Sequence, residues 1–558
     1  MQYSQTTSVV GVAMDRFDGG YQANVLRGVC EAARERGANV LAFVGGQLGD
    51  DAERTGRARV FDLIGPESVD AVVIFGAALS HRAGRTGVAE LCNWLAPLPI
   101  CSVGSELSGA SSVGIDNEAG MHDAVDHLAR HHARRRIAFV RGPATIAEAE
   151  LRFAVYRQAL EHAGIDFDDK LVFQGDFSRA SGAQAVHELF DVRGLRHGDV
   201  EAVACANDDM AAGVLDELAK RGLRVPRDLA LVGFDDSEAA RYAQPPLTTV
   251  RQPEIELGRE ALRLSLAAGE VSGPVMLATE LVRRRSCGCF GNEPSASVAP
   301  SESSLGFQAA LIERRQIMLA ELARGARGQF GMLGRGWEAQ LLSTMTQDIL
   351  GAEGTFQSGF DDLIERCLHA RIDIDACHDV LTIMRRHLMA CLASDAVRRK
   401  RADQVLDEAR ISASRAAERF QAGERIALGA HVPAFSELCV ELATARSLLE
   451  LGERLQQSSR LGLSECHLLL ADDDDSGGYR LALSHSERLG LRYPGINGGA
   501  RNLMRRALPD HGHQAMAVLP LFSQRHLGFA LVSLGSRLPI AYEVLRVALS
   551  RALDAMQR

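Results

Sequence analysis

The stretch NDDMAAGVLDELAKRGLRVPRDLALVGFDD, residues 207–236, decides the fold. Polar residues open it, an amphipathic helical segment follows, and the apolar run LALVGF leads to Asp235 and Asp236. The same alternation of short apolar runs with amphipathic helical segments extends over residues 8–290. This alternation predicts a doubly wound α/β fold, in which helices cover both faces of a mainly parallel sheet.

The predicted strands of this half are short runs rich in β-branched and other apolar residues. They are SVVGVAM (8–14), NVLAFVG (39–45), AVVIFGA (71–77), PICSVG (99–104), RIAFVRG (136–142), EAVACAND (201–208) and LALVGFDD (229–236). Because nearly all their residues are apolar, we expect strands that are covered on both faces, as in parallel sheets. The strands number about ten, which is more than one compact sheet usually holds. We therefore expect two lobes.

The rest of the chain changes character twice. Residues 291–304 include the stretch NEPSASVAPSESS and are predicted to be a linker. Residues 305–460 have helical patterning and are predicted to be a helical signalling or dimerisation region. Residues 461–558 contain apolar runs typical of antiparallel strands, a turn at DDDDSGG (472–478) and a closing helical stretch. This last part is predicted to be an α+β module.

Apolar residues, most of them alanine, recur late in the helical region, mostly at a four-then-three spacing. They are Ala402, Leu406, Ala409, Ala413, Ala416, Phe420 and Ala427. The resulting heptad seam is weak, because alanine buries little area. Two interpretations stay open, namely one helix of a bundle or a dimerising helix that transmits a signal.

The bulk composition narrows the class of protein. Of 558 residues, 46% are hydrophobic and 24% are charged, which is ordinary for a globular protein and disfavours disorder. The net charge of −10 gives no general attraction to nucleic acid. We see no signal peptide and no apolar run near the ~18 residues that span a bilayer, so we expect a cytoplasmic protein without membrane contact. Its 11 scattered cysteines are expected to be free thiols.

Several segments together resemble the LacI/GalR family of sugar-sensing regulators. Besides residues 207–236, they are GIDNEAGMHDAVDHLARHHARRRIAFVRGP (114–143), AELRFAVYRQALEHAGI (149–165) and PPLTTVRQPEIELGREAL (245–262). The resemblance covers residues 8–285 and implies the two-lobed type I periplasmic binding protein fold. It also implies a small polar, sugar-like ligand and a homodimer.

The resemblance places ligand contacts at Arg152 before FxxY, at Asn207 of ANDDM and at Asp235 of GFDD. Where the family usually has glycine after the arginine motif, this chain has Val155. The full set of candidate ligand-binding residues is Asp15, Arg16, Tyr21, Phe75, Arg152, Asn207 and Asp235.

Physical reasoning leads to most of the same residues. Asp15, Phe75, Asn207 and Asp235 lie at or just after the carboxyl ends of predicted strands, where open α/β sheets bind ligands. Asparagine and aspartate supply donors and acceptors, and Arg152 supplies a planar fork of donors. Aromatic side chains such as those of Tyr21 and Phe75 could cover the apolar face of a sugar ring.

Structural roles compete with binding at several neighbouring positions. Asp236 could cap the following turn, and Asp116 and Asn117 could be hinge and helix-capping residues. Asp208 is expected to be structural.

No catalytic or metal-binding pattern stands out. Cys287 and Cys289 form a single CxC without a second His/Cys pair nearby in the sequence, so we expect a plain exit strand and no metal. Asp510, His511 and His513 are expected to lie in a solvated loop. Phosphate-binding loops, GxSxG and HExxH are absent from the sequence, so we expect no enzyme activity and no cofactor.

Seven residues, Met1–Thr7, precede the first predicted strand, which leads us to expect no helix-turn-helix headpiece and no direct DNA binding. The ending RRSCGC, residues 284–289, resembles multidomain bacterial sensors, and residues 461–558 resemble a divergent GAF-like domain.

We therefore expect a sensor that regulates transcription or signalling through a protein partner such as a transcription factor or a kinase. Two alternatives remain. One is a sensory component of a two-component or cyclic-nucleotide system that acts on a separate kinase or cyclase. The other is a plain ligand-binding protein.

Overall fold

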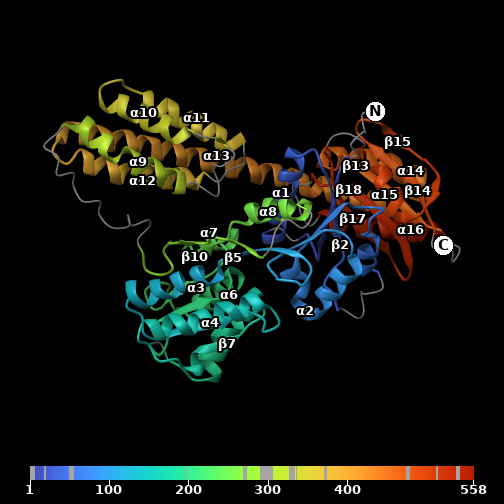
Figure 1. Cartoon of the computed structure of the whole chain (residues 1–558), viewed down its shortest axis with the longest axis horizontal. Coiled ribbons are helices and arrows are strands. Elements are labelled where there is room, and N and C mark those ends of the chain that lie inside the picture. The colour runs from blue at the N-terminus through green and yellow to red at the C-terminus, as the bar shows by residue number, and fades with distance from the viewer. Residues whose placement is uncertain are drawn as a thin grey trace. The chain divides into compact units, whose positions relative to one another are not determined.

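The structure is a computed structural model. It describes residues 7–17, 20–49, 56–196, 198–267, 273–289, 306–325, 333–334, 336–369, 374–472, 478–509, 513–535 and 541–557. Figure 1 shows the chain coloured by residue number. Contacts between residues divide it into two units. The first comprises Met1–Gly288 together with His431–Arg558, and the second comprises Cys289–Ala430.

The first lobe of the first unit contains a parallel sheet. Its strands are β1 (Val9–Met14), β2 (Asn39–Val44), β3 (Ala71–Ile74), β4 (Ile100–Val103), β5 (Ser111–Ile115) and β11 (Val275–Leu277), in the spatial order β11-β5-β4-β3-β1-β2. The associated helices are α1 (Tyr21–Glu35), η1 (Ala58–Leu63), α2 (Gly76–Leu95) and α8 (Glu254–Leu266). Every residue of β1 is buried, as its apolar sequence predicts. Helices α1 and α8 pack so closely at Gly28 that an added Cβ would lie 2.0 Å from the Ile255 carbonyl oxygen.

The second lobe has a separate four-stranded parallel sheet in the order β7-β6-β8-β9. Its strands are β6 (Ile137–Arg141), β7 (Val172–Gln174), β8 (Ala202–Cys205) and β9 (Ala230–Val232). Its helices are α3 (Asn117–Asp126), η2 (His127–His131), α4 (Ala147–His162), η3 (Asp169–Leu171), α5 (Arg179–His187), η4 (Glu188–Val192), α6 (Asp208–Lys220) and α7 (Glu238–Tyr242). An antiparallel pair, β10 (Thr249–Arg251) with β12 (Glu280–Val282), completes this half. The predicted two-lobed α/β fold is therefore confirmed, and β5, β7, β11 and the pair β10–β12 are additional strands.

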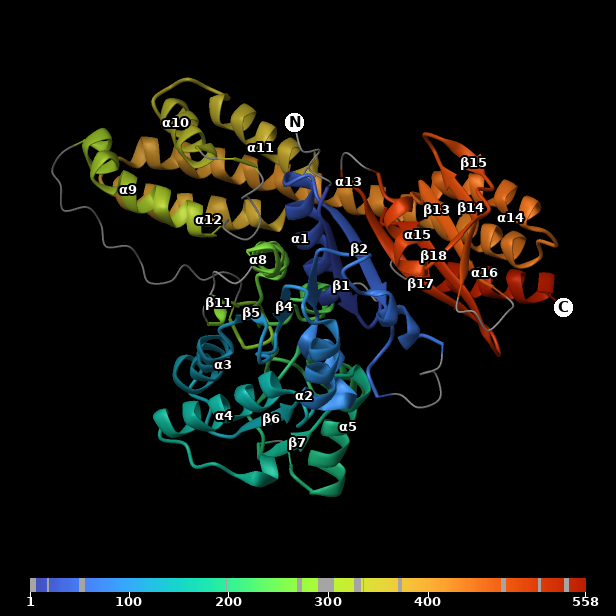
Figure 2. The same cartoon turned by 45° about the vertical axis from the view of Figure 1, so that its right-hand side comes forward.

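The C-terminal part continues the sheet of the first lobe. Strand β17 (Ala515–Phe522) pairs in parallel with β2, with Met516 opposite Leu41. Beyond it follow β18 (His526–Ser533), β13 (Glu465–Ala471), β14 (Tyr479–Ser486) and β15 (Gly490–Arg492), while β16 (Ile496–Gly498) pairs with β14. Figure 2 shows β1, β2 and β17 side by side. Because β17 covers the edge of β2, twelve strands form one sheet.

Helices cover both faces of the C-terminal strands. Helices α14 (Leu448–Leu455), η6 (Gln456–Leu461) and α16 (Ala541–Gln557) contribute to one apolar core. Helix α15 (Ala500–Ala507) contributes to another, which also contains Leu41, Phe43 and Phe529. The expected antiparallel strands and closing helix are present, and Asp473–Gly477 of the predicted turn lie outside the described residues.

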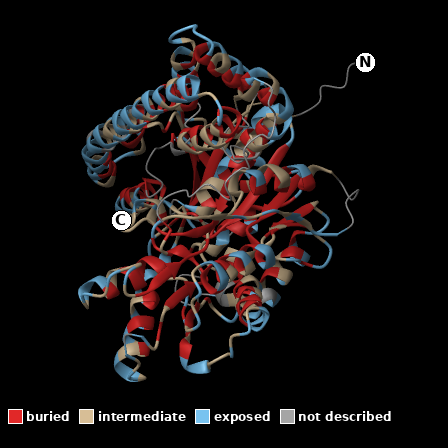
Figure 3. Cartoon of the chain, turned by 90° about the vertical axis from the view of Figure 1, so that its left-hand side faces the viewer, coloured by how far each residue is buried: buried red, intermediate tan, exposed pale blue. Residues whose placement is uncertain are grey.

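The second unit is a helical bundle. It contains α9 (Phe307–Gly325), α10 (Trp337–Ile349), α11 (Thr355–His369), α12 (Asp375–Cys391) and the first part of α13 (Ala396–Ala443). Figure 3 shows buried residues on one side of these helices and exposed residues on the other. Ala402, Leu406, Ala409, Ala413 and Ala416 are buried in the core of this bundle. The first part of the seam, from Ala402 to Ala416, therefore packs within the chain, as the bundle interpretation predicts, whereas Phe420 and Ala427 are half-buried.

Helix α13 departs from two expectations. It continues past the division at Ala430, so the predicted helical region 305–460 belongs to two units. Within the described residues, α13 is also the one helix long and apolar enough to cross a membrane, since an 18-residue window has a mean hydropathy of 1.3. This composition differs from our expectation, and by itself it is weak evidence for a membrane span.

Candidate ligand-binding site

The guanidinium of Arg152 lies where several strand ends of the sensor meet. Arg152 is buried on α4, and its Nε donates to Oδ1 of Asn117 at 2.7 Å. Its Nη1 donates to the carbonyl oxygen of Ala206 at 2.6 Å, just beyond β8. The guanidinium carbon lies 3.7 Å from the ring centroid of Phe234, which follows β9. These contacts use two of the five N–H donors that a guanidinium carries.

Asp235 faces the same guanidinium. Its Oδ1 lies 3.8 Å from Nη1 of Arg152 and accepts a hydrogen bond from Nε2 of Gln252 at 2.5 Å. Burial raises the pKa of Asp235 well above its ordinary value, although Arg152 opposes this shift. The backbone of Asp235 has a φ of 125°, which is rare for a residue with a side chain. Such strain is often found at binding sites, where the surrounding structure holds it in place.

Tyr21, the first residue of α1, extends this cluster into the first lobe. Burial raises the pKa of Tyr21 well above 10.0, and the carboxylates of Glu148, Glu254 and Asp235 raise it further. The phenol therefore interacts electrostatically with acidic groups from both lobes. This interaction relates Tyr21 of the first lobe to Asp235 of the second.

Two further carboxyl groups complete the surroundings. Burial raises the pKa of Glu148, and Arg152 is the main opposing charge. The Glu148 side chain approaches the first lobe, where a Cβ added to Gly104 would lie 3.4 Å from its Oε1. Burial also raises the pKa of Glu254 to about 7, while Asn24 donates to its Oε2 at 2.6 Å. Carboxyl groups with raised pKa values can be protonated near neutral pH and then serve as donors as well as acceptors.

Asp15 and Arg16 lie at the end of β1, as predicted. Asp15 is buried, and its Oδ1 accepts a short hydrogen bond from Nε2 of Gln22. Burial raises the pKa of Asp15, with the Gln22 hydrogen bond acting in the opposite direction. The Arg16 side chain is 62% exposed, and its Nε lies 3.8 Å from Asp15.

Phe75 and Asn207 have structural contacts in this conformation. Phe75 is 1% exposed and precedes α2, so its ring belongs to the core of the first lobe. Asn207 caps α6, because its Oδ1 accepts from the Met210 backbone N–H at 3.0 Å. Its Nδ2 donates to the Phe177 carbonyl oxygen at 3.0 Å. Ligand contact by either residue remains a prediction.

Asp236, next to Asp235, has a structural role. Burial would raise the pKa of Asp236, but ion pairs with arginines lower it, with Arg251 at 2.7 Å and Arg284 at 2.5 Å. Ser237, rather than Asp236, caps α7, which corrects the capping role we considered for Asp236.

Asp208 and Asp116 have the structural roles expected of them. The buried Asp208 accepts from Thr249 Oγ1 at 2.6 Å and from the Ser237 backbone N–H at 2.8 Å. Asp116 caps α3 by accepting from the Ala119 backbone N–H at 2.8 Å.

A family model described as a periplasmic binding protein-like domain matches residues 125–287. The chain is 32% identical over 245 residues to the HTH-type transcriptional repressor CytR of Escherichia coli K12, covering 44% of this chain and 67% of the relative. It is 35% identical over 266 residues to the HTH-type transcriptional regulator CelR of Thermobifida fusca, covering 47% of this chain and 73% of the relative. The chain belongs to the LacI/GalR family of transcriptional regulators.

A solved structure, the transcriptional regulator CelR–cellobiose complex, is 33% identical and covers 50% of this chain and 85% of that chain, with a TM-score of 0.43. All of these relatives are regulators, and the LacI/GalR part of this chain is a ligand-sensing regulatory domain. Of the residues that the LacI/GalR resemblance implies, Arg152 and Asp235 lie together, whereas Asn207 caps a helix. Val155 is buried within α4.

Sequence reasoning missed Glu148, Gln252 and Glu254. Glu148 precedes Arg152 by one helical turn on α4, so the spacing of four residues was an available signal. Gln252 and Glu254 lie inside the segment at 245–262 that carries the LacI/GalR resemblance. Gln252 reaches Asp235, and Glu254 reaches Asn24 through the packing of α8 against α1, contacts that local patterning does not show.

Proposed function

We propose that this chain senses a small, neutral, polyhydroxyl ligand, such as a sugar, held between its lobes. The observation that carries the proposal is the convergence of Tyr21 from the first lobe with Arg152 and Asp235 from the second. A guanidinium, a phenol and an aspartate offer donors and acceptors in several directions, as hydroxyl groups require. The positive charge of Arg152 faces carboxyl groups whose pKa values are raised, which favours a neutral ligand over an anion.

The division of these residues between the lobes suggests how binding is sensed. A ligand that contacts Arg152 and Tyr21 together binds best when the lobes are close. It therefore shifts the population toward that state by its difference in affinity for the two states. Ligand binding is in this way converted into a change of lobe geometry.

The C-terminal part is the proposed route of output. It is hydrogen-bonded to β2, so it would move with the first lobe. The helical unit follows the second lobe in sequence and precedes the C-terminal part, so lobe movement would act on both of its ends. We propose that this coupling reaches a protein partner, a transcription factor or a kinase, and that the C-terminal part is a GAF-like relay.

We also propose a homodimer. Because Ala402 and Ala416 are buried in the bundle, the pairing surface would lie outside this seam. Light scattering of the full chain checks the proposal, and a monomer at micromolar concentration would refute it.

A ligand screen tests the sensor. Thermal unfolding of the full chain is measured with monosaccharides, disaccharides, nucleosides and amino acids, each at high excess. A ligand that binds only the folded state adds about 2.7 kcal/mol of stability at one hundred times its dissociation constant. We expect at least one sugar to raise the unfolding temperature of the wild type more than that of Arg152→Ala.

Arg141→Ala is the matched control for Arg152→Ala. Arg141 lies in the same lobe, pairs with Glu150 at 2.5 Å and stacks over Phe153 at 3.9 Å. This variant should keep the response to the ligand. No response of the wild type to any member of the panel, or an equal response in Arg152→Ala, would refute the proposal.

A further inference from the structure

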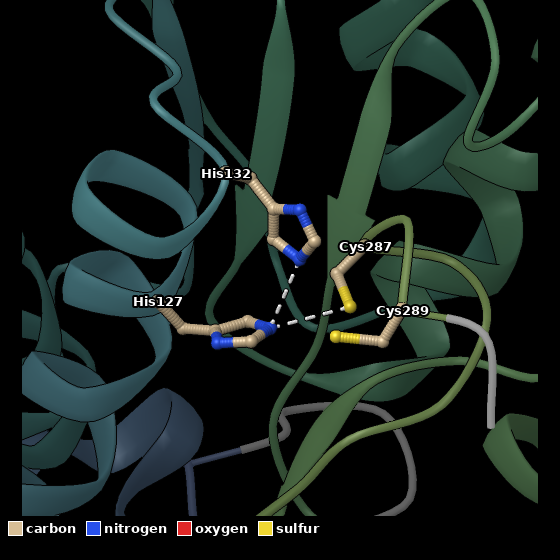
Figure 4. A group of neighbouring side chains, drawn as sticks. All are labelled: His127, His132, Cys287 and Cys289. Atoms are coloured by element: carbon tan, nitrogen blue, oxygen red, sulfur yellow. Dashed lines mark hydrogen bonds between the residues drawn. The ribbon is translucent and has the colours of Figure 1, made fainter. Parts of the chain in front are cut away.

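Two histidines and two cysteines that are far apart in the sequence converge at the end of the sensor domain (Figure 4). His127 begins η2 and His132 follows it, while Cys287 and Cys289 lie in the turn after β12. One ligand atom from each of the four lies within 4.8 Å of every other. Cys287 and Cys289 have no second His/Cys pair near them in the sequence, and the fold supplies one.

Two of the distances between these ligand atoms are close to those of a tetrahedral metal site. Nε2 of His132 lies 3.2 Å from Nε2 of His127, which lies 3.4 Å from Sγ of Cys287. Zinc with ordinary bond lengths in a tetrahedron would separate two nitrogens by about 3.3 Å and a nitrogen from a sulfur by about 3.6 Å. These two separations are within a few tenths of an ångström of those values, and all four ligand atoms lie within 4.8 Å of one another.

Figure 4 shows the two cysteine sulfurs and one nitrogen of each ring directed toward one another. We propose that these four side chains bind one zinc ion in a Cys2His2 site. Zinc fits because thiolate and imidazole are its usual ligands and four of them complete a closed tetrahedral site.

The surroundings support a built site. Thr248 Oγ1 donates to Sγ of Cys287 at 3.1 Å, and such a hydrogen bond to a ligand orients it and stabilises a thiolate. Gly288, between the cysteines, has a φ of 111°, and an added Cβ would lie 3.3 Å from Cε1 of His132. A glycine is needed there both for the backbone conformation and for the close approach of the imidazole.

Burial indicates a structural rather than a catalytic role. Cys287 is 0% exposed, Cys289 is 6% exposed and His127 is 8% exposed, while His132 is half-buried, so protein covers most of the site. The ion would join the end of the α3–η2 segment to the last residues of the sensor domain. It would fix the point from which the chain continues toward the helical unit.

The experiment measures zinc in the full chain, purified in the presence and absence of added zinc, by inductively coupled plasma mass spectrometry. We expect about one zinc ion per chain, and well below one in Cys289→Ser and in His132→Gln. Metal-free protein given cobalt(II) alone should show the thiolate charge-transfer and tetrahedral ligand-field bands, and both variants should lose them.

Two variants are matched controls. His131→Gln removes an exposed histidine whose ring stacks on His127 at 4.8 Å, and Cys30→Ser removes a thiol remote from the site. Both should keep one zinc ion per chain. Circular dichroism checks the fold of each variant, and the cobalt spectrum of the wild type tests the site even if a cysteine variant does not fold.

Three results would overturn the proposal. The wild type could take up neither zinc nor cobalt, or folded Cys289→Ser and His132→Gln could keep a full equivalent. Mass spectrometry could also show a Cys287–Cys289 disulfide in freshly purified protein.

Discussion

The two lobes of the sensor share an α/β fold, but their sheets differ in what lies beyond the edge strand. In the first lobe, β17 continues the sheet beyond β2, and the apolar core runs without interruption from Phe43 to Phe529. In the second lobe, the described strands of the sheet are β7, β6, β8 and β9, and Phe139 stacks on Tyr156 in its core. The comparison teaches that the C-terminal part is built onto one lobe, whereas the arginine of the candidate ligand site belongs to the other.

Truncating Phe529 should have the largest effect, because it disrupts the core that joins the first lobe to the C-terminal part. Phe529 is 1% exposed in the core that the first lobe shares with the C-terminal strands. Phe529→Ala should lower the free energy of unfolding by about 3–5 kcal/mol, because it leaves a cavity. Hydrogen exchange should rise in β2 as well as in β17 and β18.

Phe139→Ala is the matched variant in the second lobe, where Phe139 is 0% exposed. It should raise exchange in β6 and β8 and leave β17 and β18 protected. If Phe529→Ala leaves exchange in β2 unchanged, the C-terminal part is an independent domain and the comparison fails.

The second prediction concerns the charged centre of the second lobe. Arg152→Ala and Asp235→Asn should each weaken binding of a ligand identified by screening by roughly tenfold to a hundredfold. A hydrogen bond to a charged group contributes about 1.5–3 kcal/mol. Asparagine also tolerates the positive φ of Asp235, so this variant should keep the fold. Titration calorimetry measures the affinity, and an unchanged affinity removes that residue from the site.

The third prediction uses Glu254, whose pKa is raised from 4.5 to about 7 by burial. The folded state then binds this proton more tightly than the unfolded state does. The resulting stability is complete below about pH 4.5 and is lost as the pH rises through about 7. Between about pH 5 and pH 8, the wild type should therefore lose more stability than Glu254→Gln. Urea unfolding at each pH measures the free energy of unfolding. If this free energy changes equally with pH in the two proteins, the prediction is contradicted.

Local patterning predicted most of the framework, because buried parallel strands such as β1 and β8 are apolar at nearly every position. It missed short strands such as β7 and β10, whose three residues carry too little pattern. Local patterning also did not predict the pairing of β17 with β2, because any apolar strand could cover that edge.

In the candidate site too, local motifs were predicted and contacts between distant segments were missed. Arg152 and Asp235 were predicted from motifs, and the structure brings them together. Glu254 came near them only through the packing of helices. His127 and Cys287 lie 160 residues apart, so the sequence offered no spacing that joined them.

The smallest effect is expected at the rim of the contact between the first lobe and the C-terminal part. There Arg505 Nη2 lies 3.0 Å from Asp70 Oδ1, and both side chains are about one-third exposed (32% and 39%). Exposed ion pairs contribute about 0.2–1 kcal/mol, and salt weakens them further. A double-mutant cycle with Arg505→Ala and Asp70→Ala should therefore give a coupling within that range that falls in high salt. The pair Arg221–Asp191 of the second lobe, at 2.5 Å, is the matched control and should give a similar value. If coupling at Arg505 is several times larger, charge rather than the shared core around Phe529 joins the C-terminal part to the first lobe.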